Sequence, residues 1–172
     1  MLKENRKWLC TTIISLAGFI LAIYLAYEDH QYKRLSARPI LSISTYQNEE
    51  GVGFKLLSGG LGRAIYKWTE VQVDGIPQKD WESVDKLLEF SNINDRIWGY
   101  FTPGVSIRPG ESPKFYWKKP GPNAEKLKTD HKRITIRLCY CSMYEECWLT
   151  VYANGEAFSN PACGEKPKIL FP

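Results

Sequence analysis

A run of twenty uncharged, mostly apolar residues near the N-terminus constrains this chain more than any other feature. It extends from Trp8 to Tyr27 and reads WLCTTIISLAGFILAIYLAY. Twenty helical residues, at about 1.5 Å of rise each, span the roughly 30 Å of a bilayer's hydrocarbon core. Because lipid offers no partner for backbone polar groups, the run is predicted to be a single membrane-spanning helix.

The residues that flank this run predict how it is oriented. Trp8 stands at one end and Tyr24 and Tyr27 at the other, where amphipathic rings prefer the membrane interface. Basic residues near the end of a span resist translocation, so residues 1–7 are expected to be cytoplasmic. The C-terminal domain is then extracytoplasmic, on a single-pass protein of the plasma (inner) membrane. The flanking basic residues are Lys3, Arg6 and Lys7 before the run, and Lys33, Arg34 and Arg38 after it.

A cleaved signal peptide is the competing interpretation of residues 8–27. Such peptides have apolar regions of about 7–15 residues followed by a small-residue cleavage site. This run is longer, and no A-x-A-like site and no acylatable cysteine follow it. We therefore expect an uncleaved signal anchor.

Small residues recur every fourth position inside the run. Gly18, Ala22 and Ala26 share one helix face, a spacing that allows a second helix to approach closely. The helix could therefore contact another membrane protein or a second copy of this chain. Small residues are also common in membrane helices without any such contact.

The remaining chain divides into a tether, residues 28–38, and one domain, residues 39–172. Pro39 ends the helical pattern, because a proline disfavours helical angles in the residue before it. The domain has 17 basic and 16 acidic residues, and this near-neutral balance argues against a nucleic-acid partner. Residues 118–132 are predicted to be a polar, solvated loop. For the basic cluster that extends from Lys114 to Arg133, contact with anionic lipid headgroups is the alternative.

Short segments with strand-like alternation and frequent turns predict a mainly β domain. Asp74-Gly75 and Asn154-Gly155 are predicted turns, and residues 80–90 a short amphipathic helix capped by Asp80, with its acids on the outer face. Gly60 and Gly62 are expected to form a tight turn with positive φ between antiparallel strands. The fold class is an N-terminal transmembrane helix followed by an antiparallel Ig-like β-sandwich with one inserted helix. Strands are predicted at 40–45, 52–57, 64–73, 97–101, 105–108, 113–117, 134–141 and 147–152.

Four of the five cysteines lie in the half of the chain placed outside, which favours two disulfides. A five-residue loop sets Cys141 opposite Cys147 on paired strands, close enough for a bridge. Cys139 faces the same side as Cys141, and of the three pairings that four cysteines allow, the preferred one joins Cys139 to Cys163 in the tail. Zinc is the alternative, although the paired C-x2-4-C knuckles typical of structural zinc are missing.

No catalytic, cofactor or metal residues are nominated by the sequence. The two histidines, His30 and His131, stand in no nucleophile or metal motif. A thiol–disulfide exchange site at Cys139 and Cys141 is the sharpest enzymatic alternative. It requires a lowered thiol pKa, and the neighbouring acids Glu145 and Glu146 would raise that pKa.

Two stretches together resemble a set of uncharacterised bacterial single-pass membrane proteins with a small β-sandwich outside the membrane. They are GVGFKLLSGGLGRAIYKWTEVQVDG (Gly51–Gly75) and CYCSMYEECW (Cys139–Trp148). The glycine loop of that set more usually continues G-x-G-P-A, whereas Arg63 here replaces the proline. The resemblance implies the architecture and carries no activity.

Three hypotheses for function follow. The favoured one is a membrane-anchored, non-enzymatic binding or scaffold domain that acts on a neighbour in the same membrane. The second is a small envelope enzyme or thiol-redox factor that uses Cys139 and Cys141. The third is a protective, immunity-type factor at the membrane, which the size and anchoring permit.

Overall fold

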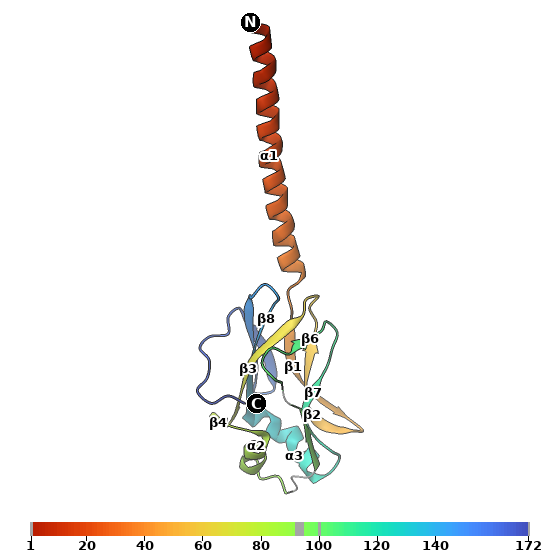
Figure 1. Ribbon diagram of the computed structural model, residues 1–172. Helices are drawn as coiled ribbons and strands as arrows, with labels where there is room; N and C mark the ends of the chain where they lie inside the picture. The colour runs from red at the N-terminus through yellow and green to blue at the C-terminus, as the bar shows by residue number, and fades with distance from the viewer. Residues whose placement is uncertain (1, 92–94, 100, 172) are drawn as a thin grey trace. The chain divides into compact units, whose positions relative to one another are not determined.

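The computed structural model describes residues 2–91, 95–99 and 101–171 (Figure 1). It separates into two compact units, a helical unit of residues 1–36 and a domain of residues 37–172. The domain therefore begins two residues before the predicted boundary at Pro39.

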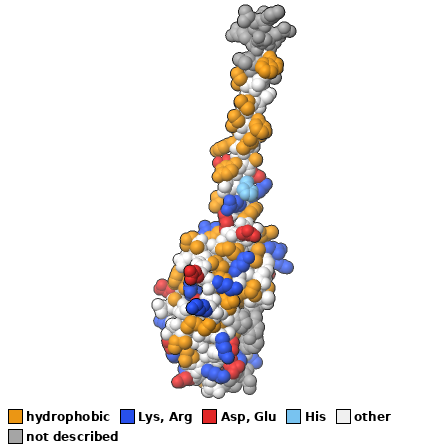
Figure 2. All heavy atoms as spheres, turned by 60° about the vertical axis from the view of Figure 1, so that its left-hand side comes forward, with side chains coloured by type: hydrophobic (Ala, Val, Ile, Leu, Met, Phe, Trp, Pro, Cys, Tyr) orange, Lys and Arg blue, Asp and Glu red, His pale blue; other side chains and the backbone are white. Residues whose placement is uncertain are grey.

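The N-terminal unit is one long helix, α1 (Leu2–Ser36). Among the described residues it is the one helix long and apolar enough to cross a membrane, over Thr12–Ser36. Its hydrophobic side chains are exposed along the upper part, and charged side chains gather toward its C-terminal end (Figure 2). The predicted tether is helical as far as Ser36, with an ion pair of 2.6 Å between Lys33 and Asp29.

The domain is built from two antiparallel sheets. The first has the order β1-β2-β7-β5 and the second the order β10-β9-β8-β3-β4, with β6 also paired to β3. The first sheet consists of β1 (Leu41–Asn48), β2 (Gly51–Ser58), β5 (Arg96–Trp98) and β7 (Lys114–Lys118). The second consists of β3 (Ala64–Val73), β4 (Ile76–Gln78), β6 (Ser106–Ile107), β8 (Ile134–Cys141), β9 (Cys147–Ala153) and β10 (Glu156–Asn160).

Aromatic side chains fill the space between the sheets. The rings of Phe54 and Tyr152, one from each sheet, meet edge to face with centroids 5.1 Å apart. The indole of Trp81 stacks on the ring of Tyr116 at 4.2 Å. Edge-to-face and offset-stacked pairs add to the free energy gained from burial alone. This apolar core explains why the short strands, each marginal alone, form a stable unit.

Two predicted turns are confirmed. Asp74 and Gly75 have φ of 52° and 80°, and Asn154 and Gly155 have φ of 53° and 89°. Two consecutive positive φ values define the hairpin turn whose twist matches that of the flanking strands. Each turn leads into a strand that the sequence analysis did not predict, β4 and β10.

Short helices lie at the end of the domain opposite the loop that follows β8 (Figure 1). α2 (Trp81–Leu87) begins after Asp80, whose carboxylate accepts from the Ser83 backbone N–H at 2.7 Å. α3 (Pro122–Asp130) and a 3₁₀ turn (His131–Arg133) occupy residues predicted to be a polar loop, so that prediction was wrong. Pro122 favours helix initiation, and α3 buries only a narrow apolar side, so its periodicity was weak.

The glycine-rich connection differs from its prediction. β2 and β3 belong to different sheets, and neither Gly60 nor Gly62 has positive φ. Instead, a Cβ on Gly62 would collide with the carbonyl oxygen of Ala37, and one on Gly60 with that of Arg38. The glycines are needed because the connection packs directly on the backbone of the residues entering the domain.

Candidate functional site

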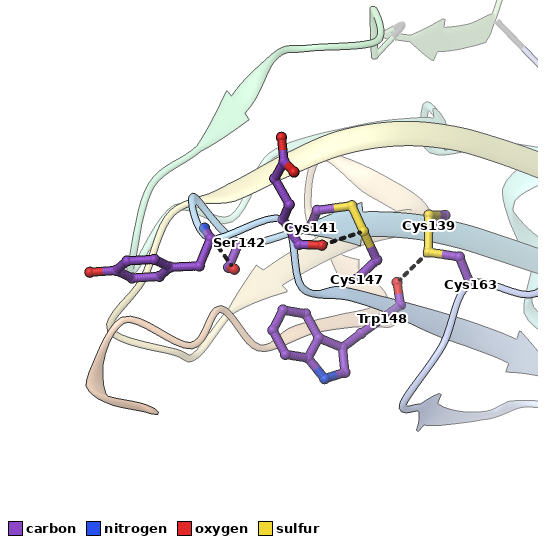
Figure 3. Close-up of a disulfide and its surroundings, with 8 residues drawn as sticks. Cys139, Cys141, Ser142, Cys147, Trp148 and Cys163 are labelled. Atoms are coloured by element: carbon purple, nitrogen blue, oxygen red, sulfur yellow. Dashed lines mark hydrogen bonds between the residues drawn. A yellow bond between two sulfur atoms is a disulfide. The ribbon is translucent and has the colours of Figure 1, made fainter. Parts of the chain in front are cut away.

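Two disulfides cross-link the end of β8 (Figure 3). Cys141 is bonded to Cys147 across the β8–β9 hairpin, and Cys139 is bonded to Cys163 in the C-terminal tail. The register places Cys141 opposite Cys147, and Tyr140 opposite Trp148. The pairing preferred from the sequence is therefore the pairing that the structure contains.

Cys139 and Cys141 do not form a pair with each other. Each is bonded to a different cysteine, and their side chains are 3% and 2% exposed. In this state neither sulfur is a thiolate, the form that attacks other disulfides. The bridges act here as cross-links that fix the hairpin tip and the tail to the second sheet.

A buried ion cluster holds the opposite end of the domain. Asp85 of α2 is 1% exposed and accepts from the Tyr116 hydroxyl at 2.6 Å. Its other oxygen accepts from the Lys118 ammonium at 3.0 Å and from the Arg96 guanidinium at 3.1 Å. Asp85 was expected on the outer, solvated face of its helix, and that expectation was wrong.

The cluster extends from Lys118 into α3. The fully buried Lys118 ammonium also donates to Asp95 at 3.3 Å and lies 4.6 Å above the Phe90 ring. Asp95 in turn accepts from the Asn123 side chain at 2.8 Å. The cluster therefore links α2, β5, β7 and α3 through charged hydrogen bonds.

The protonation of the cluster follows from its burial. Desolvation, followed by the negative charge of Asp85, raises the pKa of Tyr116 well above its usual value. The phenol stays a hydrogen-bond donor, which is what the Asp85 carboxylate requires. Perturbed groups often mark active sites. Here the groups satisfy one another, and the central Asp85 and Lys118 side chains are closed to solvent, so we assign the cluster a structural role.

A concave site lies between the first hairpin and α3, and we call it the α3 cleft. It has a volume of about 300 Å³. Ligand sites typically combine an apolar wall with a few convergent polar groups, and this cleft has both. Its lining residues are Thr45, Tyr46, Gln47, Val52, Gly53, Phe54, Leu127, Lys128 and His131.

Hydrogen-bonding groups in the α3 cleft are mostly neutral. His131 Nδ1 lies 2.6 Å from the Tyr152 hydroxyl, and burial followed by the Lys132 charge lowers the pKa of His131. Burial raises the pKa of Tyr152 to about 12. Burial, and then the nearby Glu50, also raises the pKa of Tyr46, whose buried hydroxyl has no hydrogen-bond partner among the described residues.

The chemistry of the α3 cleft suits recognition of a small polar group. At neutral pH it offers an imidazole and a phenol in their uncharged forms. Lys128 adds one ammonium, which is held at 2.5 Å by Glu125. No set of three or more potential metal-ligating side chains occurs among the residues that the structure describes.

The predicted membrane residues all lie on α1. Trp8, Tyr24 and Tyr27 are 72%, 57% and 60% exposed. Gly18, Ala22 and Ala26 are exposed and spaced four residues apart on the helix. The helix buries none of this surface within its own chain.

Sequence reasoning missed the α3 cleft because it placed His131 in a loop. One local signal was available, since Pro122 opens a segment in which Ala124 and Leu127 stand three residues apart. No local signal could bring Tyr46 near His131, because 85 positions separate them in the chain. Comparison with known proteins adds no further candidate: no family model, no curated protein and no solved structure matches this chain.

Proposed function

We propose that this chain is a membrane-anchored, extracytoplasmic binding domain. Residues 8–27 span the bilayer, with residues 1–7 in the cytoplasm. The domain is an Ig-like antiparallel sandwich presented outside the membrane. Its function is to bind a partner or ligand near the membrane surface.

One observation carries this proposal, namely that an apolar helix of spanning length leads directly into a disulfide-bonded domain. Stable disulfides form in oxidising compartments such as the bacterial periplasm, the endoplasmic reticulum lumen or the cell exterior. The two bridges of this domain therefore favour the side of the membrane away from the cytoplasm. The positive residues before the apolar run, Lys3, Arg6 and Lys7, favour the same orientation.

The α3 cleft is the binding site that we propose for a small polar ligand or an exposed side chain of a partner. The polar side chains of Gln47, Lys128 and His131 support this, because they converge on the cleft beside apolar lining residues. Leu127 and Phe54 would supply apolar contact area beside the polar groups.

Thiol labelling in intact cells tests the orientation. Cells expressing the full chain are treated with a membrane-impermeant maleimide, with and without an impermeant reductant, and labelled cysteines are identified by mass. We expect Cys139, Cys141, Cys147 and Cys163 to label only after reduction. Labelling without reductant would show free thiols outside the membrane and favour the thiol-redox or zinc alternatives. No labelling of intact cells in either condition, with full labelling of the same four cysteines in lysed and denatured samples, would overturn the extracytoplasmic assignment. A Cys10→Ser chain removes the background from the helix.

Site-specific crosslinking tests the cleft. A photoreactive residue at Gln47, which lines the cleft, is compared with one at Lys79, which is exposed outside it. We expect crosslinked species from position 47 that disappear in a Tyr46→Ala chain and are missing at position 79. Equal crosslinking at both positions would show that the cleft is not the binding site.

A further inference from the structure

Three segments meet at the end of the domain where the chain enters from α1, and we call this end the entry face. They are residues 37–40, the glycine-rich segment 58–62 and the hairpin loop 142–146. Gly59 donates its backbone N–H to the Ile40 carbonyl at 2.9 Å. Pairing of Ile65 with Cys141 brings the other two segments together. The Arg38 guanidinium lies 5.2 Å from the Trp148 ring centroid.

Large apolar side chains point into solvent from each of these segments. Leu61 is 80% exposed, Met143 71%, Ile40 52% and Tyr144 40%. Their chain neighbours Gly60, Gly62 and Ser142 are buried. Apolar side chains gathered at one end of a domain mark an interaction surface more often than isolated ones do.

The backbone of the hairpin loop and of the glycine-rich segment is fixed by local contacts, so that these side chains stay exposed. In the hairpin loop the Cys141–Cys147 bridge closes the base, and the Ser142 N–H donates to the Glu146 carbonyl at 2.7 Å. The Tyr144 N–H donates to the Ser142 hydroxyl at 3.1 Å. Around Leu61, the two glycines pack on the entering backbone without space for a side chain. Both tips are therefore preorganised for a surface that lies beyond them.

Chain length places the bilayer within reach of the entry face. The apolar run ends at Tyr27, and residues 28–36 continue as helix. Nine helical residues at 1.5 Å each extend at most about 13 Å from the hydrocarbon edge, and any tilt shortens this distance. The polar headgroup layer fills roughly 5–8 Å of it.

We propose that the entry face rests on the bilayer, with Leu61 and Met143 inserted into the headgroup layer; this inference rests on the membrane anchoring proposed above. Tyr144 is an aromatic side chain of the kind enriched at membrane interfaces. Arg38 and Arg63 are exposed beside the tips and can reach lipid phosphates. The exposed Glu145 offsets part of the positive charge of Arg38 and Arg63. Apolar side chains therefore supply most of the attraction to the bilayer, and no anionic lipid is required.

Such a contact would orient the domain. The α2–α3 end lies at the opposite end of the domain from the hairpin loop after β8, which belongs to the entry face (Figure 1). With the entry face on the bilayer, the α2–α3 end and the nearby α3 cleft would face away from the membrane, toward soluble or protruding partners.

Nitroxide depth measurements test the contact. The full chain, with Cys10→Ser, is oxidised, spin-labelled at a single introduced cysteine and reconstituted in phosphatidylcholine vesicles. The labelled variants are Leu61→Cys and Met143→Cys. Ile76→Cys is the matched control, because Ile76 is 55% exposed and follows the other end of β3. Accessibility to oxygen, relative to a water-soluble nickel complex, reports immersion.

We expect the oxygen-to-nickel ratio to be at least several-fold higher at positions 61 and 143 than at position 76. Equal ratios at all three positions would overturn the contact. An Ile20→Cys label separates this failure from failure of the anchor. If position 20 is immersed and positions 61 and 143 are not, the anchor stands and the inference falls; if position 20 is not immersed, the proposed anchoring itself falls.

Two further backgrounds test whether apolar contact, and not charge attraction, holds the entry face on the bilayer. In a Leu61→Asp background, the label at Met143 is expected to lose most of its immersion, whereas an Arg63→Gln background leaves it within twofold. Both substitutions are at exposed positions, so the fold is preserved. Loss of immersion in Arg63→Gln alone would overturn the apolar contact in favour of charge attraction.

Discussion

The two ends of the domain fasten their peripheral segments in different ways. At the entry face, covalent bridges fix the hairpin loop and the tail to the second sheet. At the α2–α3 end, the buried charges of Asp85 and Lys118 hold two helices against the first sheet. Each solution fixes irregular segments that bury too little apolar surface to stay in place alone.

The difference teaches where each end is vulnerable. A disulfide restricts the unfolded chain and resists changes of single neighbouring side chains. In a buried ion pair each charge needs the other, because removal of one partner leaves the remaining charge buried without compensation. The α2–α3 end should therefore be sensitive to substitution, and the entry face to reductant.

The largest effect is expected from Asp85→Ala in the ion cluster. Among the described residues, this change leaves the fully buried Lys118 with Asp95 as its one charged partner. Breaking a buried pair costs about 3–5 kcal/mol of unfolding free energy. The measurement is urea unfolding of the full chain in mild detergent, followed by tryptophan fluorescence. Glu82→Gln, which breaks an exposed pair with Lys86 on the same helix, is the control and should leave the midpoint unchanged. Equal midpoints for both variants would show that the cluster does not hold the helices.

Next in size is removal of the tail bridge by Cys139→Ala with Cys163→Ala. The bridge joins residues 24 positions apart. The loop-entropy relation assigns such a loop about 3.5 kcal/mol. Urea unfolding under oxidising conditions measures the loss. Reductant should bring the unmodified chain below this variant, because it also opens the second bridge.

A smaller loss is expected from Cys141→Ala with Cys147→Ala. These residues are only 6 positions apart, and the same relation gives about 2.4 kcal/mol. If a disulfide acts only on the unfolded chain, loop length alone sets its effect. The Cys139/Cys163 variant should then lose more unfolding free energy than the Cys141/Cys147 variant. A reversed order would mean that the hairpin bridge stabilises the folded tip itself, beyond its effect on the unfolded chain.

The smallest effect is a pH dependence confined to the α3 cleft. Folding lowers the pKa of His131, so the unfolded chain binds a proton at a higher pH than the folded one. The resulting stabilisation is fully present above the unfolded pKa of about 6.5 and is lost as pH falls through the folded pKa. His131→Gln should therefore flatten the fall of unfolding free energy as pH drops below about 6.5, the unfolded pKa. Parallel pH profiles for the two proteins would contradict this assignment.

The sequence by itself determined the elements whose signals are local. The apolar run, the Asp74-Gly75 and Asn154-Gly155 turns and the strand from Ala64 to Val73 all follow from adjacent residues. The two disulfide pairs were also within reach, because hairpin register sets Cys141 opposite Cys147 and leaves one cysteine for Cys139.

Only the tertiary structure decided the features that depend on distant residues. Asp85 looked like a solvent-facing acid, yet Lys118, 33 positions later, makes its burial possible. The glycines at 60 and 62 looked like turn residues, yet they are required by the backbone of Ala37 and Arg38. Likewise α3 and the cleft beside it exist because Ala124 and Leu127 have a sheet to pack on. Local periodicity reports what a segment prefers, but burial, charge compensation and close backbone approach are set by the neighbours that folding brings to it.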